Sequence, residues 1–150
     1  MAKIIYIGAD HAGFKLKEKM KKYLERLGYE VRDEGNNKFE LRDDFTDFAV
    51  KVSKNVVKTK GKGILICGTG QGMCVAANKV KGTRAYYAYD KNTAEHAAKH
   101  GDANILCLPG YSKEKTAQDI VKTWFKTKFS KAKRYVRRIK KLKNIERSNK

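Results

Sequence analysis

The most constraining feature of this sequence is a short apolar segment that runs directly into a glycine-rich turn. Residues 64–66 are Ile-Leu-Ile and follow two nearby glycines, so they predict a short buried strand. Gly68, Gly70 and Gly72 come directly after Cys67 and allow the backbone to turn sharply. Residues 71–79 then favour a helix. The segment therefore predicts a strand, a glycine loop and a helix N-terminus.

A loop of this kind is suited to binding an anion. Its unpaired N–H groups and the positive end of the helix dipole would point at one place. Cys67 would lie at its mouth, where a thiolate is favoured, and could act as a base or nucleophile. The alternative is a small buried cysteine that simply ends a strand. The glycine spacing matches neither G-x-G-x-x-G nor G-x-x-x-x-G-K-[ST], so we do not predict a nucleotide site.

Strands and helices alternate along the rest of the chain. We expect further strands at 3–9, 29–32, 84–88 and 104–108, and further helices at 14–27, 44–58, 92–100 and 112–128. This alternation predicts an α/β fold in three layers, with a Rossmann-like five-stranded parallel sheet and helices on both faces. Ligands of such sheets bind at the carboxyl ends of the strands. Asp10 and His11, which follow the first strand, should therefore share one rim with Cys67.

The 150 residues fit a single domain, residues 1–150, that ends in a basic amphipathic tail at 131–150. Within this tail, Tyr135, Val136, Ile139, Leu142 and Ile145 form an apolar stripe at helical spacing. We expect the tail to form a helix that folds back on its own core or docks on a partner subunit.

The formal net charge is +19, and its excess lies near the C-terminus. Residues 112–150 hold 15 of the 35 Lys and Arg residues but only 3 of the 16 acidic residues. One interpretation is a surface for nucleic acid or another polyanion. We favour solvated helix faces, because the cations are mostly Lys and are not interleaved with exposed aromatic residues.

Cysteine usage and hydropathy exclude several other classes of protein. Three cysteines without C-x-x-C spacing argue against a disulfide framework and against a structural zinc site, and we expect no metal. No apolar segment approaches the roughly 20 residues of a membrane span. Residues 1–10 resemble a strand more than a signal peptide. We therefore expect a soluble, cytoplasmic protein without a membrane partner.

Four more residues are candidates for chemistry, each with a structural alternative. Asp10 could instead cap a turn, because Asp accepts backbone N–H groups well. His100 could instead be a favourable cation at a helix C-terminus. Arg134 and Arg138 are four residues apart and could clamp a phosphate from one helix face, although basic residues are common nearby.

Taken together, five segments closely resemble the ribose-5-phosphate isomerase B family, which includes galactose-6-phosphate isomerase subunits and allose-6-phosphate isomerases. They occur in the family's order and cover nearly the whole chain: GADHAGFKLK at 8–17, ILICGTGQGM at 64–73, AANK at 76–79, GTRA at 82–85 and HGDANIL at 100–106. The resemblance implies interconversion of an aldose phosphate, ribose 5-phosphate, and its ketose, ribulose 5-phosphate, through an enediol(ate). It also implies that neither a metal nor an organic cofactor takes part.

The resemblance also assigns roles to individual residues. Cys67 matches the base that moves a proton between C1 and C2, whereas the family's alternative Glu is replaced by Met73. Thr69 would relay a hydroxyl proton, and His100 would assist ring opening with Asp10 nearby. His11 and the amides of the glycine loop would contact substrate. The segment RYVRRI matches the family's phosphate-binding segment after a one-residue insertion, which assigns the phosphate to Arg134 and Arg138, with Arg137 as the competing choice.

Family members are dimers or pairs of dimers whose active sites take residues from two chains, so the resemblance implies a homodimer or a dimer of dimers. The chain departs from the family at three places: Gly101 replaces an Asn, Phe45 replaces a Tyr, and Tyr111 stands near a lost Arg, with Lys113 as a possible substitute. These changes leave another sugar phosphate open as substrate, such as allose 6-phosphate, galactose 6-phosphate or a tetrose phosphate. A non-catalytic anion or nucleic-acid binder is the less favoured alternative.

Overall fold

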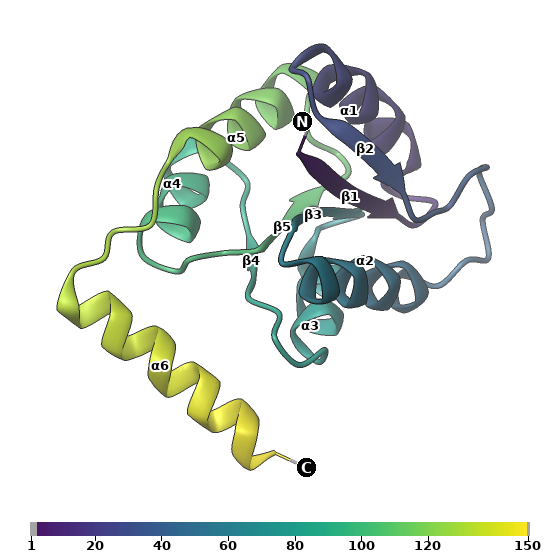
Figure 1. The fold of residues 1–150 in the computed structure, drawn as a ribbon. Helices are drawn as coiled ribbons and strands as arrows, with labels where there is room; N and C mark the ends of the chain where they lie inside the picture. The colour runs from purple at the N-terminus through teal and green to yellow at the C-terminus, as the bar shows by residue number, and fades with distance from the viewer. Residues whose placement is uncertain (1–2, 150) are drawn as a thin grey trace.

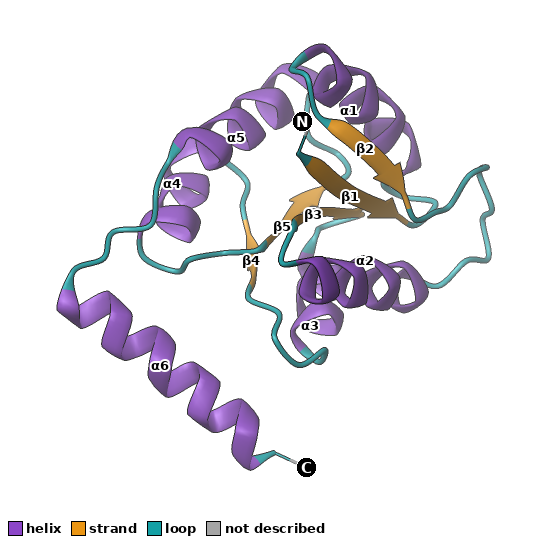
Figure 2. Ribbon diagram, in the orientation of Figure 1, coloured by secondary structure: helices purple, strands orange, loops and turns teal. Residues whose placement is uncertain are grey.

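The computed structural model describes residues 3–149 and confirms the α/β class (Figures 1 and 2). All strand pairs are parallel, and the sheet order is β2-β1-β3-β5-β4. The strands are β1 (Ile4–Ala9), β2 (Glu30–Asp33), β3 (Lys62–Cys67), β4 (Ala85–Tyr87) and β5 (Ile105–Pro109). The helices are α1 (Phe14–Arg26), α2 (Phe45–Thr59), α3 (Gln71–Asn78), α4 (Lys91–Lys99), α5 (Glu114–Lys126) and α6 (Lys133–Ser148).

The sheet separates two apolar clusters. One contains Ile64 and Ile66 of β3 and packs against α1, α4 and α5, while the other contains Leu65 and Cys67 and packs against α2 and α3. Successive side chains of a strand point to opposite faces, so β3 supplies both cores. Burial on both faces explains why this strand has a continuous apolar sequence.

Element boundaries differ modestly from those expected. β3 extends from Lys62 to Cys67. It pairs with β1 on one side and with β5 on the other, and these pairs continue beyond the apolar residues 64–66. β4 is shorter than expected, at three residues, and pairs with β5 alone. α5 begins at Glu114, two residues later than expected, because Lys113 still has extended backbone.

Helix α6 stands apart from the three layers at the end of a linker (Figure 1). The linker is tied to the end of α4, where the Ser130 N–H donates to the Lys99 carbonyl over 2.8 Å. Near the C-terminal end of α6, the Glu146 carboxylate accepts the Gly82 N–H over 2.8 Å. Of its apolar stripe only Ile139 is buried, while Val136, Leu142 and Ile145 are exposed. No helix among residues 3–149 combines the length and apolar character needed to cross a bilayer.

Candidate active site

Cys67 lies at the carboxyl end of β3, directly before the glycine loop. Its side chain is 5% exposed and packs in the cluster that contains Met73 and Cys107. The strand end and the burial are those expected of a structural cysteine, yet the residue also directly precedes the glycine loop. The nearby backbone N–H groups of Met73, Gly70 and Gly72 favour the thiolate and act to lower its pKa. Burial nevertheless outweighs them and, with a smaller contribution from Asp10, raises the pKa of the thiol above its ordinary value.

The glycine loop is held in a conformation that presents its amides. Gly70 is the N-cap of α3 and has φ 84°, in the left-handed region that favours glycine. A side chain there would also crowd Tyr87 and the Leu108 backbone. Thr69 is exposed at the mouth of the loop, and its Oγ1 accepts the Gln71 N–H over 3.4 Å. The loop therefore joins amides, a hydroxyl and a thiol, as the sequence predicts.

The loop after β1 adjoins the glycine loop, which confirms that the two share one rim. Asp10 is buried, and its Oδ1 accepts the N–H groups of Ala12 and Gly13 over 3.0 and 3.2 Å. Its capping role is thus real, although burial still raises the pKa of its carboxyl group. A third loop joins them, because the Gly110 N–H donates to the Cys67 carbonyl over 2.6 Å.

His11 adds an imidazole to this rim. Its Nδ1 lies 2.8 Å from Oδ1 of Asp43, in the loop before α2. Donor atoms of Asp10, His11 and Asp43 lie within 4.8 Å of one another, a spacing that a metal ion could bridge. However, both carboxylates already accept hydrogen bonds from protein N–H groups. We therefore interpret the group as a hydrogen-bonded assembly.

A second group of candidate residues forms where α4 and α6 meet. The His100 ring stacks between His96 and Tyr135, with ring centroids 4.9 and 4.3 Å away. The guanidinium carbons of Arg134 and Arg138 lie 4.5 and 5.7 Å from the centroid of Tyr135. The imidazole and the two guanidinium groups thus share one aromatic ring.

The electrostatics of this second group suit it to an anion. Desolvation lowers the pKa of His100, and the positive charges of Lys99, Arg134 and Arg138 lower it further. The imidazole is therefore neutral near pH 7 and can accept a proton. Within the described chain Arg137 has no comparable contact with Tyr135.

Within one chain, the two groups lie at opposite edges of the sheet. Asp90 caps the start of α4 just after β4, so α4 runs back toward the amino ends of the strands. Asn104, four residues after His100, accepts the Gly63 N–H at the amino end of β3. Cys67 and Asp10 lie at the carboxyl ends, roughly 15 Å away along a strand of this length. Asp10 and His100 are therefore well separated within a single chain.

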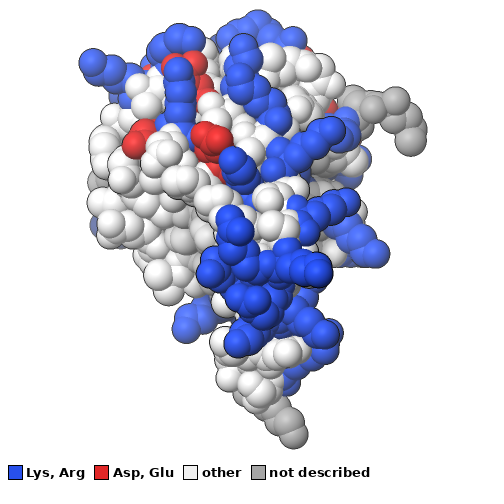
Figure 3. Space-filling model, turned by 90° about the vertical axis from the view of Figure 1, so that its left-hand side faces the viewer, with Lys and Arg blue, Asp and Glu red and all other residues white. Residues whose placement is uncertain are grey.

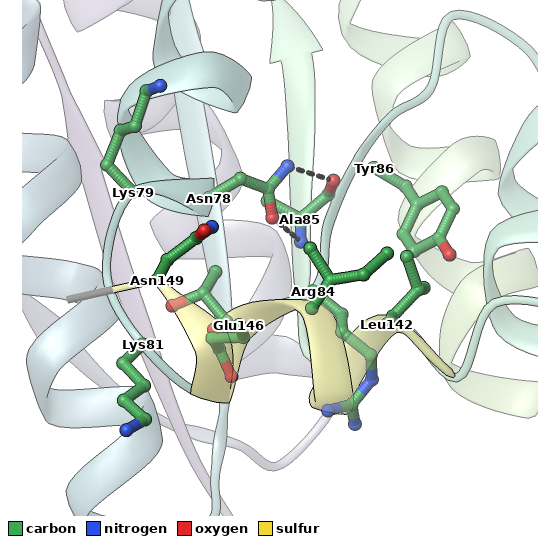
Figure 4. Close-up of a pocket in the computed structure, with 11 residues that line it drawn as sticks. Asn78, Lys79, Lys81, Arg84, Ala85, Tyr86, Leu142, Glu146 and Asn149 are labelled. Atoms are coloured by element: carbon green, nitrogen blue, oxygen red, sulfur yellow. Dashed lines mark hydrogen bonds between the residues drawn. The ribbon is translucent and has the colours of Figure 1, made fainter. Parts of the chain in front are cut away.

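The surface around α6 is strongly basic. Figure 3 shows Lys and Arg side chains gathered over this helix, with few acidic groups beside them. Between α6 and the α3–β4 segment is a groove of about 590 Å³ (Figure 4). Its floor is fixed because the Asn78 amide exchanges two 2.9 Å hydrogen bonds with the backbone of Ala85. Leu142 and Glu146 line the α6 side.

Two of the departures noted in the sequence have a clear structural setting. A Cβ atom at Gly101 would collide with the phenol ring of Tyr86, so Tyr86 fills the space of a side chain at 101. The ring of Phe45 lies directly over Gly72 of the glycine loop. Sequence reasoning missed Tyr86, Tyr135 and Asp43; only the Tyr135 position, beside Arg134, carried any signal.

Comparisons with known proteins show the family of this chain. A family model described as Ribose/Galactose Isomerase matches residues 5–142. The chain belongs to this family. "Probable ribose-5-phosphate isomerase B" of Mycoplasma genitalium is 46% identical over 106 residues, covering 69% of this chain and 70% of that protein. "Ribose-5-phosphate isomerase B" of Mycobacterium tuberculosis is 35% identical over 147 residues, covering 97% and 91%.

Solved structures of this ribose/galactose isomerase family share the fold over its full length. The ribose-5-phosphate isomerase B of M. genitalium with bound ribulose 5-phosphate has a TM-score of 0.94 and 39% identity, covering 99% of both chains. The Clostridium thermocellum ribose-5-phosphate isomerase B has a TM-score of 0.93 and 40% identity, covering 98% of this chain and 99% of that one. The resemblance noted in the sequence is therefore confirmed at the level of family and fold.

Proposed function

We propose that this protein interconverts ribose 5-phosphate and ribulose 5-phosphate, with Cys67 as the proton-transfer base. The observation that carries the proposal is the position of Cys67 at the carboxyl end of β3, directly before the glycine loop and the N-terminus of α3, in a member of the ribose/galactose isomerase family. The solved M. genitalium relative with bound ribulose 5-phosphate supports the choice of substrate.

In the proposed reaction, the Cys67 thiolate takes the proton from C2 of the open-chain aldose. The electron pair moves onto the carbonyl oxygen at C1, and N–H groups of the glycine loop stabilise the resulting enediolate. Thr69 relays a proton between the two hydroxyl oxygens, and the thiol returns its proton to C1 to give the ketose. A raised pKa leaves less thiolate at pH 7 but makes each thiolate a stronger base toward carbon.

We further propose that the working site is built by two copies of the chain. His100 of the partner subunit would then assist ring opening, and the partner's Arg134 and Arg138 would bind the phosphate. Two observations support this: the two residue groups lie at opposite edges of one chain, and α6 exposes Val136, Leu142 and Ile145. A homodimer or a dimer of dimers would cover these apolar side chains.

A second substrate is favoured by one observation. Tyr86 takes the space of a side chain at position 101 and lies beside His100 in the same hollow. A phenol there would change which sugar hydroxyls can be hydrogen-bonded, so a hexose 6-phosphate or tetrose phosphate is the alternative. Measuring kcat/KM across a panel of sugar phosphates separates these substrates.

A coupled assay with ribose 5-phosphate tests the main proposal on the wild type and Cys67→Ala. Loss of a positioned base should lower kcat by about 10²–10⁴-fold. Circular dichroism and gel filtration serve as controls that the variant keeps its fold and oligomeric state. Turnover by Cys67→Ala at the wild-type rate would reject Cys67 as the base.

A further inference from the structure

One carboxylate from another part of the chain contacts His11 at two points, its backbone N–H and its ring nitrogen Nδ1. Oδ1 of Asp43 accepts the backbone N–H of His11 over 3.0 Å and lies 2.8 Å from its Nδ1. The Asp43 side chain is 6% exposed, whereas the His11 side chain is 33% exposed. The imidazole therefore has a fixed inner edge and an open outer edge.

Asp43 is itself held by a chain of hydrogen bonds that ends in the core. Its Oδ2 accepts from Nδ2 of Asn36 over 3.1 Å. The Asn36 backbone is fixed at both polar groups, because its N–H donates to the Ala9 carbonyl and its carbonyl accepts from Nζ of Lys17 over 2.7 Å. Lys17 is fully buried and also pairs with Asp33 over 2.6 Å.

This arrangement decides which ring nitrogen of His11 carries a proton. A carboxylate only accepts hydrogen bonds, so Nδ1 must be the donor. Nε2, on the opposite side of the ring, has no protein partner among residues 3–149 and is free to meet a ligand. The edge of the Phe39 ring packs against the imidazole at a centroid distance of 6.4 Å and limits its rotation.

The charged groups near the ring favour the imidazolium. The hydrogen bond to Asp43 raises the pKa of His11, burial lowers it less, and the negative charges of Asp10 and Asp43 raise it further. Asp10 belongs to the same loop and Asp43 to the loop before α2; no cation contributes. A protonated His11 presents an N–H at Nε2 that an anionic oxygen can accept.

We propose that Asp43 is the positioning residue for His11: it fixes Nδ1–H and directs the Nε2–H donor at an anionic oxygen of the substrate. Asn36 and Lys17 hold Asp43 in place. The inference rests on the proposed function for the identity of the substrate, but not for the orientation of the ring. It deepens that function by naming a residue that acts through His11.

The experiment compares two variants with a matched control. Asp43→Asn removes the charge, and the double change Asn36→Asp with Asp43→Asn restores a carboxylate–amide pair between the two positions while moving the charge away from the ring. The control is Asp44→Asn, because Asp44 is adjacent in sequence and its side chain makes no capping hydrogen bond. NMR of the ring nitrogens reports the tautomer and pKa of His11, with His11→Gln used to assign its signals.

In the wild type and in Asp44→Asn we expect Nδ1–H and a raised pKa. In Asp43→Asn and in the double variant we expect the pKa of His11 to fall by about one unit. With ribose 5-phosphate, both should raise KM by about 10-fold and change kcat by less than about 3-fold, as expected when a group binds substrate and transition state alike. An unchanged His11 pKa and tautomer in Asp43→Asn would overturn the inference.

Titration with inorganic phosphate separates this inference from the proposed function. The His11 signals of the wild type should shift at lower phosphate concentration than those of Asp43→Asn. If the wild type turned over no sugar phosphate yet kept this difference, the isomerase proposal would fail and the positioning role would stand. If both proteins responded alike to phosphate, the positioning role would fail whatever the activity.

Discussion

The phenol ring of Tyr86 occupies the space that any side chain at Gly101 would need. The two residues come from β4 and from the segment after α4, and both line a hollow with His100 and Arg138. Desolvation raises the pKa of Tyr86, so its hydroxyl is protonated and able to donate a hydrogen bond at neutral pH. A phenol that enters from the sheet therefore stands where a side chain at position 101 would lie.

This relationship predicts that positions 86 and 101 are coupled. Gly101→Asn alone should destabilise the protein by about 1–3 kcal/mol, because it forces the Tyr86 ring from its place. Tyr86→Ala with Gly101→Asn should recover most of that loss. Thermal unfolding of the two single variants and the double variant measures the coupling; additive effects would contradict it.

Much of the fold could be predicted because its signals are local. The apolar residues of β3 and the spacing of Leu16, Met20 and Leu24 in α1 report burial directly. The boundaries of β4 could not be predicted, because its three paired residues depend on hydrogen bonds to β5, which follows only after helix α4. The position of α6 depends on contacts that a periodic pattern does not specify.

The candidate site divides in the same way. Asp10, His11 and Cys67 could be placed on one rim, because parallel strands end at a common edge. His100 follows a helix whose direction is reversed, so its distance from Cys67 depends on the topology of the sheet. Nothing in the sequence pointed to a functional role for Asp43. Asp44 is adjacent to it in the same polar loop, and the sequence does not show which of the two carboxylates would contact His11.

The buried Lys17–Asp33 pair predicts a stability that depends on pH. Burial alone would raise the pKa of Asp33, but hydrogen bonds from Lys17 and Lys21 outweigh it and lower the pKa below 3.8. This contribution is present above pH 3.8 and is lost as the pH falls through the lowered pKa. Lys17→Met should therefore cost about 2–3 kcal/mol at pH 7, since Lys21 still pairs with Asp33.

Urea unfolding of wild type and Lys17→Met between pH 3 and 7 measures this difference. The deficit of the variant should narrow only as the pH falls below 3.8 toward the lowered pKa of Asp33, where the folded protein begins to take up this proton. Lys19→Met is a suitable control, because Lys19 lies on the same helix and is 57% exposed, with only a 4.0 Å contact to Glu114. A deficit that stayed constant over this pH range would contradict the ion pair as its cause.

The raised pKa of Cys67 predicts how its alkylation depends on pH. Because burial keeps the thiol protonated, the rate with iodoacetamide should rise about 10-fold per pH unit from pH 7 to 9 without a plateau. Cys74 differs, because its neighbour Cys107 lowers the pKa of the Cys74 thiol below 9.0. Mass spectrometry of each modified peptide measures the alkylation rates of Cys67 and Cys74. A plateau in the rate of Cys67 below pH 8 would contradict a raised pKa for its thiol.

The opposite placement of Cys67 and His100 within one chain predicts complementation between two inactive variants. On the proposed two-chain site, the Cys67→Ala protein and the His100→Ala protein should each have very low activity with ribose 5-phosphate. In a heterodimer, one site would lack both groups, while the other would take Cys67 from one subunit and His100 of the partner subunit. Random pairing after co-refolding should therefore restore about one quarter of the wild-type activity, since half the dimers would carry one intact site.

Cys67→Ala mixed with Thr69→Ala is the matched control, because both changes fall in the same half-site and no intact site can form. Recovery in that control, or its absence in the first mixture despite heterodimers seen by native mass spectrometry, would reject a site shared between two chains.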